Sequence, residues 1–195
     1  MRNRTLKRMH RIRSVLELRQ KDLTLVLANI HDPHNVSAIL RSCDAFGVPL
    51  VHLYYTNEVF PKPGGKSSAS ARKWVDLERH DDARTMVRGL RQKGYQIFCA
   101  DLDKNAVSIS DCDFTKPTAI VLGNEHRGVD SEILDLVPDR VCIPMQGMIQ
   151  SLNVSVAAAV FLYEAWRQRT AKGMYAEPSF DPRTLENMIE DWSRR

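Results

Sequence analysis

Apolar and polar residues alternate along the chain in blocks whose lengths match strands and helices. Short apolar runs predict buried strands, which fall at residues 23–28, 50–55, 73–75, 95–100, 118–122 and 141–143. Stretches with helical character lie between and after them, at 36–46, 80–93, 131–136 and from 153 onward. Because strands and helices succeed one another in this way, the sequence predicts an α/β fold with a mainly parallel sheet.

Helical patterns also occupy the two ends of the chain. Residues 5–20 carry apolar side chains at helical spacing with arginines mainly between them, and a terminal helix is expected near 183–192. One face of the first helix can pack while the other offers charge to phosphates. The stretch 56–71 is rich in Pro, Gly, Ser and Lys, and its composition fits a substrate flap and a plain linker equally well.

The segment 141–169 joins a strand to a long helix through a polar loop. The strand stops at Pro144, and Ser151 and Asn153 are both good helix N-caps. The free N–H groups of a helix start can meet an anion or a polar ligand, although an ordinary capped helix would leave the same pattern. A dense polar set favours a binding site, and it comprises Gln146, Gln150, Ser151, Asn153 and Ser155.

Three polar loops, at 29–35, 123–128 and 145–153, each follow an apolar strand. Ligands of open parallel sheets bind at the carboxyl ends of the strands, so these loops are candidates for a joint site. The glycine-rich turn of dinucleotide-binding proteins is missing after the first strand, and the Walker A, GxSxG and HExxH motifs are absent too. The site would therefore belong to another class.

Arg41 lies among core-facing residues of the helix that follows the first loop, and it shares a face with Ser37. An arginine in such surroundings needs a partner. That partner is either Asp44 or backbone within the protein, or a phosphate of the substrate.

Composition places the chain among soluble globular proteins. It has 195 residues, of which 43% are hydrophobic and 27% charged, and no apolar run approaches the roughly 20 residues that span a membrane. With no signal-peptide pattern, we expect a cytoplasmic location without membrane association. The four cysteines form no CxxC pair and fit no zinc spacing, so we expect reduced thiols and no bound metal.

Charge is unevenly distributed along the chain. Residues 1–21 contain eight basic residues and one acidic residue, a net charge of +7, while the whole chain carries +4 and the remainder therefore −3. A run of charged residues often marks only a helix face exposed to solvent. Because nearly all charges in this segment are positive, it favours a polyanionic partner, in particular a nucleic acid.

Three motifs together resemble a known family. NIHDPHNVSAILRSCDAFGV, IVLGNEHRGV and IPMQGMIQSLNVSVAAAVFLYEAWRQR are similar to the signature motifs of the SPOUT superfamily, and within it to the TrmH family of tRNA guanosine-2′-O-methyltransferases. RQKDLT at 19–24 and FTKPT at 114–118 extend the resemblance, which covers residues 5–175. The chain departs at Ser70, where the family pattern leads us to expect glycine.

The resemblance implies a SPOUT-type parallel sheet flanked by helices, with a C-terminal trefoil knot. It divides the chain into a basic N-terminal helix (1–20), a methyltransferase domain (21–173) and a C-terminal helical extension (174–195). It also implies a homodimer whose active site lies near the subunit interface. S-adenosylmethionine would bind in the knot, with the binding positions Ala100, Leu122, Gly123, Asn124, Glu125, Ile143, Met145, Ser151 and Leu152.

The same resemblance implies Arg41 as the catalytic residue, supported by Asn35, Glu125, Ser151 and Asn153. A ribose 2′-hydroxyl must lose its proton to accept the methyl group. Arg41 would act as the base, or it would fix the adjacent phosphate and stabilise the developing negative charge, since a guanidinium gives up its proton only above about pH 12. The expected RNA contacts are Arg8, Arg11, Arg19, His34 and Arg41.

The expected function is methylation of guanosine 18 in the tRNA D-loop, because the chain adds only a short basic helix and a short tail to the domain. Alternatives are 2′-O-methylation of 23S rRNA or of the tRNA wobble nucleotide. A relative that binds RNA without catalysis is a further alternative, and the intact set Arg41, Glu125, Ser151 and Asn153 argues against it.

Overall fold

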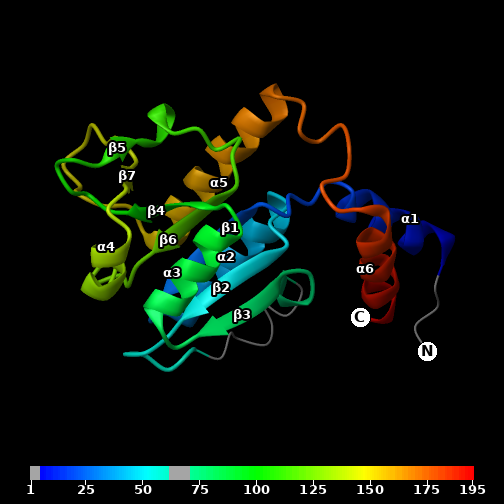
Figure 1. Ribbon diagram of the computed structural model, residues 1–195, viewed down its shortest axis with the longest axis horizontal. Helices are drawn as coiled ribbons and strands as arrows, with labels where there is room; N and C mark the ends of the chain where they lie inside the picture. Colours follow the sequence, from blue (N-terminus) through cyan, green and yellow to red (C-terminus); the bar gives the residue numbers. More distant parts are fainter. Residues whose placement is uncertain (1–4, 62–70) are drawn as a thin grey trace.

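A seven-stranded sheet forms the centre of the computed structural model, which describes residues 5–61 and 71–195 (Figure 1). Every strand pair is parallel, and the strand order is β3-β2-β1-β6-β4-β7-β5. The strands are β1 (Leu23–Ala28), β2 (Leu50–Tyr54), β3 (Asp76–His80), β4 (Gln96–Ala100), β5 (Val107–Ser108), β6 (Thr118–Leu122) and β7 (Arg140–Cys142). The predicted α/β class with a parallel sheet is confirmed.

Helices cover both faces of this sheet and also form a pair beside it. The α-helices are α1 (Leu6–Leu16), α2 (Pro33–Ala45), α3 (Ala83–Gln92), α4 (Ser131–Leu136), α5 (Val154–Ala171) and α6 (Pro182–Arg194), with 3-10 turns η1 (Ala71–Lys73) and η2 (Ile109–Asp111). Among the described residues, no helix has both the length and the apolar character needed to cross a membrane.

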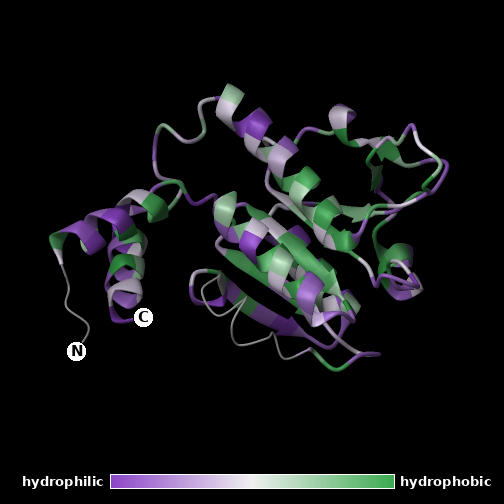
Figure 2. Ribbon diagram, turned by 180° about the vertical axis from the view of Figure 1, so that it is seen from behind, coloured by the Kyte–Doolittle hydropathy of each residue, from purple (hydrophilic) through white to green (hydrophobic). Residues whose placement is uncertain are grey.

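The central strand β1 explains why the sheet is buried on both sides. Leu25 and Leu27 pack into the core beneath α2 and α5, whereas Val26 and Ala28 pack into the core beneath α3 and α4. A strand with two buried faces has no polar alternation, which is why LTLVLA reads as a continuous apolar run. Figure 2 shows the same contrast, with hydrophobic colour in the central strands and hydrophilic colour at the β3 edge.

The two ends of the chain pack against each other as α1 and α6, which lie together beside the sheet (Figure 1). Ile12 and Leu16 of α1 bury their side chains against Leu185, Ile189 and Trp192 of α6. These residues follow the helical spacing that predicted α1, although the helix ends at Leu16 instead of residue 20. The helical extensions therefore share one small hydrophobic core.

Two element boundaries differ from the prediction because of helix caps. Helix α2 begins at Pro33 and not at residue 36, since the Asp32 side chain accepts a hydrogen bond from the N–H of His34 and proline is well suited to the first turn. Helix α3 begins at Ala83, capped by Asp82, where the prediction began it at residue 80.

The predicted strand at 73–75 is wrong, and the true edge strand follows it. Residues 71–73 form η1, and β3 has the mostly polar sequence DLERH, with two exposed and three half-buried residues. An edge strand gains its hydrogen bonds from one neighbour and needs few apolar side chains, so an apolar run does not mark it. Strand β5, in a stretch where we predicted no element, is only two residues long.

Candidate functional site

A cavity of ≈ 420 Å³ opens at the carboxyl ends of three adjacent strands, β6, β4 and β7. Its wall is completed by the loop before α5 and by the first turns of that helix. All nine positions that the resemblance assigned to the cofactor line this cavity: Ala100, Leu122, Gly123, Asn124, Glu125, Ile143, Met145, Ser151 and Leu152. Positions from three separate loops thus share one site.

The prediction missed part of the cavity lining. Asp101 and Leu102 follow β4, and Ala157 and Phe161 come from the inner face of α5. The sequence could have indicated Asp101, because it comes directly after an apolar strand, as the other loops of the site do. Ala157 and Phe161 are ordinary core residues in sequence, and only the packing of α5 reveals their place.

The glycines of the 123–128 loop allow the chain to fold back on itself beside the cavity. A Cβ atom added at Gly123 would lie 2.1 Å from the carbonyl carbon of Gly128, so no other residue fits there without backbone movement. Gly128 has φ +71°, a conformation that side chains rarely adopt. Asn124 and Gly128 form an isolated antiparallel bridge, and the Asn124 side chain donates to the Asn29 carbonyl at 2.7 Å.

Glu125 fastens this loop to the first polar loop. Its carboxylate accepts hydrogen bonds from the backbone N–H groups of His31 at 3.0 Å and Asp32 at 3.2 Å, and from Asn35 Nδ2 at 2.7 Å. Burial by itself would raise the pKa of Glu125, but the hydrogen bonds from Asn35 and from the backbone outweigh it, and the pKa lies below its ordinary value. The carboxylate therefore stays charged at neutral pH.

Asn35 carries the connection onward to α5. Its Oδ1 accepts a hydrogen bond at 3.0 Å from Asn153 Nδ2, while the Asn153 Oδ1 accepts one at 2.8 Å from the N–H of Ser155 and thereby caps α5. Asn153 is thus the N-cap, and Ser151 is an exposed residue of the cavity wall. A chain of hydrogen bonds from Glu125 through Asn35 to Asn153 joins the three predicted loops.

Arg41 lies on α2, two turns after Asn35, and its side chain is exposed. Among residues 5–61 and 71–195 its guanidinium has no hydrogen-bond or ion-pair partner. Asp44, the intramolecular partner that we had considered, is paired with Arg19 instead. The guanidinium of Arg41 is therefore open to a ligand.

Arg19 is a correction to the predicted RNA contacts. Its side chain is 0% exposed, pairs with Asp44, donates to the Val48 carbonyl at 2.8 Å and lies over the ring of Trp192 at 5.2 Å. Burial lowers the pKa of Arg19, and Asp44 offsets part of that effect. A buried and paired guanidinium cannot reach RNA phosphate, so Arg19 holds the helical pair to the domain.

The other predicted RNA contacts lie at or near the surface. Arg11 on α1 and His34 at the start of α2 are exposed, and Arg8 is half-buried. Arg13, one turn further along α1, is engaged with Glu186 of α6 at 2.7 Å. The helical pair thus uses part of its positive charge internally and leaves part of it available to a partner.

The fold and the site define a class of α/β proteins whose ligand cavity lies at the carboxyl edge of a parallel sheet. A sequence model of the SpoU rRNA Methylase family matches residues 22–163, which is most of the chain. The chain belongs to the SpoU methylase family.

Similar proteins are known in sequence and in structure. The chain is 45% identical, over the full length of both chains, to a tRNA (guanosine(18)-2′-O)-methyltransferase of Thermus thermophilus. It is 41% identical to the enzyme of that name from Aquifex aeolicus, over 96% of this chain and 89% of that one.

Two solved structures share the fold. The A. aeolicus TrmH/SpoU tRNA modifying enzyme superposes with a TM-score of 0.90 at 41% identity, covering 96% of this chain and 95% of that one. The SpoU methyltransferase AviRb from Streptomyces viridochromogenes, solved in complex with the cofactor AdoMet, has a TM-score of 0.68 at 26% identity, covering 78% and 60% of the two chains.

Proposed function

We propose that this protein transfers a methyl group from S-adenosylmethionine to the ribose 2′-oxygen of guanosine 18 in tRNA. The observation that carries the proposal is the cavity, which gathers nine residues from separate loops and is tied by hydrogen bonds to the loop that precedes α2. The full-length similarity to enzymes of that name supports the choice of tRNA and of nucleotide 18.

The cavity suits S-adenosylmethionine in size and in chemistry. A volume of ≈ 420 Å³ lies within the range of cofactor pockets, and Asp101, Asn124, Ser151 and Asn153 contribute polar side chains to its lining. Apolar contact comes from Leu122, Ile143 and Leu152. When bound, the cofactor supplies a methyl group activated by a sulfonium centre.

Arg41 would act on the RNA side of the reaction. Because its guanidinium is exposed and unpaired within the described chain, it can bind the phosphate beside the target ribose and stabilise negative charge on the 2′-oxygen. In the other role that the resemblance implies, Arg41 would first lose a proton to solvent and would then accept the proton of the hydroxyl. The network of Glu125, Asn35 and Asn153 would position the loops without touching the methyl group.

We further propose that the chain works as a homodimer and that its cavity loops belong to a trefoil knot. Apolar side chains on α5 support the dimer: Val156, Tyr163 and Trp166 are 48%, 52% and 38% exposed, at a spacing that places them on one helix face. A second copy covering this face would bring its own residues close to the start of α5, and thus to the cavity.

The RNA would lie across both the domain and the helical pair. Arg8 and Arg11 of α1, together with His34 and Arg41 near α2, are the basic groups that we assign to this contact. Their phosphate contacts would give tRNA affinity that decreases as salt concentration rises. A protein that acts on tRNA in this way is expected in the cytoplasm.

The test is methyl transfer from labelled S-adenosylmethionine to unmodified tRNA transcript. We expect label with the wild-type protein and its loss both with Arg41→Ala and with a transcript carrying adenosine at position 18. Label that persists on the altered transcript would move the target to another nucleotide, such as the wobble position, or to ribosomal RNA. Binding of tRNA without any transfer would overturn the enzyme proposal in favour of an RNA-binding protein.

A further inference from the structure

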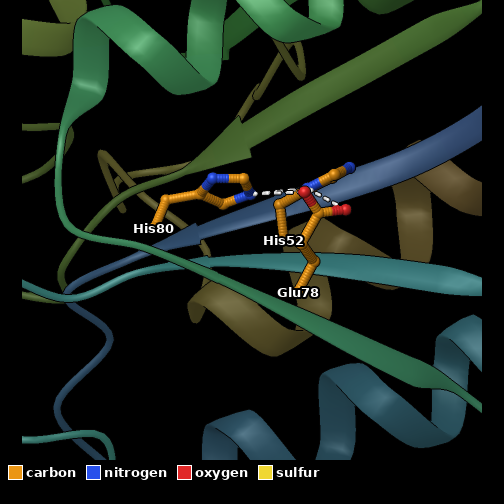
Figure 3. A group of neighbouring side chains, drawn as sticks. All are labelled: His52, Glu78 and His80. Carbon is orange, nitrogen blue, oxygen red and sulfur yellow. Dashed lines mark hydrogen bonds and ion pairs between the residues drawn. The ribbon is translucent and has the colours of Figure 1, made fainter.

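A second cluster of reactive side chains lies at the opposite edge of the sheet from the cavity. It consists of His52 on β2 and of Glu78 and His80 on the edge strand β3 (Figure 3). None of the three lines the cavity, and strand β1 separates β2 from the nearest cavity strand, β6. The proposed methyl transfer gives this cluster no role.

The parallel pairing of β2 with β3 brings the three side chains to one point. His52 and Glu78 are Cα partners in the strand register, and His80 follows Glu78 by two residues, which places both on the same face of the strand. His52 alternates with Val51 and Leu53, which pack beneath α2 and α5. The cluster therefore lies on the opposite face, which α3 and α4 cover.

The ligand atoms converge at distances close to those of a metal site. His52 Nδ1 lies 2.9 Å from His80 Nε2, and the two Glu78 oxygens lie 3.7 Å from these nitrogens, one oxygen facing each ring. A tetrahedral zinc ion with bonds of about 2.0–2.2 Å holds its ligand atoms about 3.3–3.6 Å apart. Side-chain movements of a few tenths of an ångström are enough to reach that geometry.

The two rings already turn one nitrogen each toward the centre of the cluster. His52 Nδ1 and His80 Nε2 face each other in a hydrogen bond. Two neutral rings that face each other share a single hydrogen. That hydrogen can move to the outer nitrogen of its own ring, which frees two lone pairs toward the centre.

We propose that His52, Glu78 and His80 bind a zinc ion, with water at the fourth position. Two imidazoles and one carboxylate form a ligand set typical of zinc, whereas magnesium and calcium prefer oxygen alone. Glu78 is 44% exposed, so the ion can enter from the solvent side of the edge strand. The competing interpretation is a hydrogen-bonded histidine pair without a metal.

Such an ion would fasten the edge strand to the sheet. Among the described strands, β3 pairs only with β2, and its side chains are mostly polar and partly exposed. Besides the backbone hydrogen bonds, Leu77 packs against the core and Asp76 pairs with Arg195, so a metal ion would add a further link. Zinc that binds the folded chain and not the unfolded one raises the melting temperature. The role that we assign to the ion is to stabilise the fold, although three protein ligands and one water form an open zinc site.

The experiment uses the full chain, stripped of metal with a chelator and kept reduced. Isothermal titration with zinc chloride is expected to show one equivalent bound, with an affinity at least tenfold weaker in His52→Gln, His80→Gln and Glu78→Gln. His10→Gln, which changes an exposed histidine on α1, serves as the matched control and should bind as the wild type does. The melting temperature should rise with zinc in the wild type and in the control alone.

Cobalt separates this site from the cysteines. Its visible spectrum should lack the intense thiolate bands, because Cys142 and the other cysteines lie outside the cluster. The Glu78→Gln side chain has nearly the same size as glutamate and stays partly exposed, so this variant should fold and retain methyl transfer while its zinc affinity falls. Loss of zinc binding with intact methyl transfer would therefore test the zinc site independently of the proposed function. Equal zinc affinity in all variants, no binding by the wild type, or thiolate bands would overturn the zinc site.

Discussion

At the scale of single residues, Glu125 shows how one charge can organise several loops. Three donors from the loop before α2 and from its first turn converge on its carboxylate. The residue was expected at the site from the resemblance, but the resemblance did not say what Glu125 contacts. Its partners come from residues about ninety positions away in the chain, a separation that no local pattern reports.

We predict that Glu125→Gln lowers stability by about 1–2 kcal/mol at pH 7, a value reduced by the partial exposure of the group. The folded-state pKa of Glu125 lies below its ordinary value of 4.5, so the charged form stabilises the fold above that pH. The stabilisation is lost as pH falls through the folded pKa. Urea unfolding at a series of pH values should therefore show the two proteins converging below pH 4.5.

The control for this measurement is Glu177→Gln, which alters an exposed carboxylate. It should leave the unfolding free energy within about 0.5 kcal/mol of the wild-type value. A difference between Glu125→Gln and wild type that stays constant down to the lowest pH would contradict an electrostatic role, because shape alone has no such pH dependence.

Gly123 sets a second prediction at the same scale. Gly123→Ala would place a methyl group 2.1 Å from backbone atoms of Gly128, and we expect a loss of about 1–3 kcal/mol together with weaker binding of S-adenosylmethionine. Gly89→Ala is the matched control, because a Cβ there meets nothing within 4 Å inside α3. That change should raise stability by about 0.5–1 kcal/mol. Thermal unfolding and titration with S-adenosylmethionine measure stability and cofactor affinity for both variants. Equal changes in Gly123→Ala and Gly89→Ala would refute the steric argument.

At the scale of elements, α5 connects the cavity to the loops that precede two central strands. Its first turn is capped by Asn153 at the site, and Arg169 in its last turn is 0% exposed. Arg169 donates to the carbonyls of Phe114 at 2.9 Å and Lys116 at 3.1 Å, and it pairs with Asp22. The helix is therefore fixed at both ends.

We predict that Arg169→Ala costs about 3–5 kcal/mol, because it leaves Asp22 and several carbonyls without their donor. Arg167→Ala is the control within the same helix turn. Arg167 is exposed, its one ion-pair partner in the described part of the chain is Glu164, and the loss should be below about 1 kcal/mol. Denaturant unfolding of the two variants measures the difference. Similar losses would mean that the helix dipole, which both arginines share, matters more than burial.

The elements also show what sequence reasoning can and cannot reach. Strands 23–28 and 118–122 were located to the residue, because burial on both faces leaves an unbroken apolar run. The edge strand β3 was placed wrongly, since one-sided pairing removes that signal. Arg19 was assigned to RNA from charge alone, and only the fold reveals that Asp44 and Trp192 enclose it.

The cluster of His52, Glu78 and His80 illustrates the same limit. The alternation of Glu78 and His80 would have suggested two ligands on one strand face, had 76–80 been read as a strand. The third ligand arrives through the pairing of β2 with β3, which local sequence does not specify. The strand pattern made the three polar loops candidates for one site, and the family resemblance supplied the individual cavity residues.

At the scale of the whole molecule, the termini and the edge strand are tied into one body. Arg195 pairs with Asp76 of β3 at 3.0 Å, and Trp192 lies 4.8 Å from Trp74 between ring centroids. The helical pair is thus held beside the domain from two sides, by Arg19 and by the C-terminal residues. A basic surface fixed in this way can position tRNA relative to the cavity, which a freely moving arm would do less well.

The exposed apolar face of α5 leads to the last prediction, that the active protein is a dimer. Trp166→Glu places a charge within this face, and burying an unpaired charge in an interface is costly, so we expect monomers in sedimentation velocity at micromolar concentration. The variant should keep its fold by circular dichroism, because Trp166 is already 38% exposed in the single chain. Methyl transfer should fall with the dimer, since the cavity adjoins the first turns of α5.

Leu6→Glu is the control for this substitution, because it introduces the same charge at an exposed leucine on α1, away from α5. Its dimer should match that of the wild type. The added charge lies on the same helix as Arg8 and Arg11, so a loss of methyl transfer with an intact dimer would report weaker tRNA binding. A wild-type protein that is monomeric while it transfers methyl groups would refute the dimer and leave the α5 face without a second subunit. A Trp166→Glu monomer with full activity would instead place the whole site within one chain, so that the partner serves stability and not the reaction.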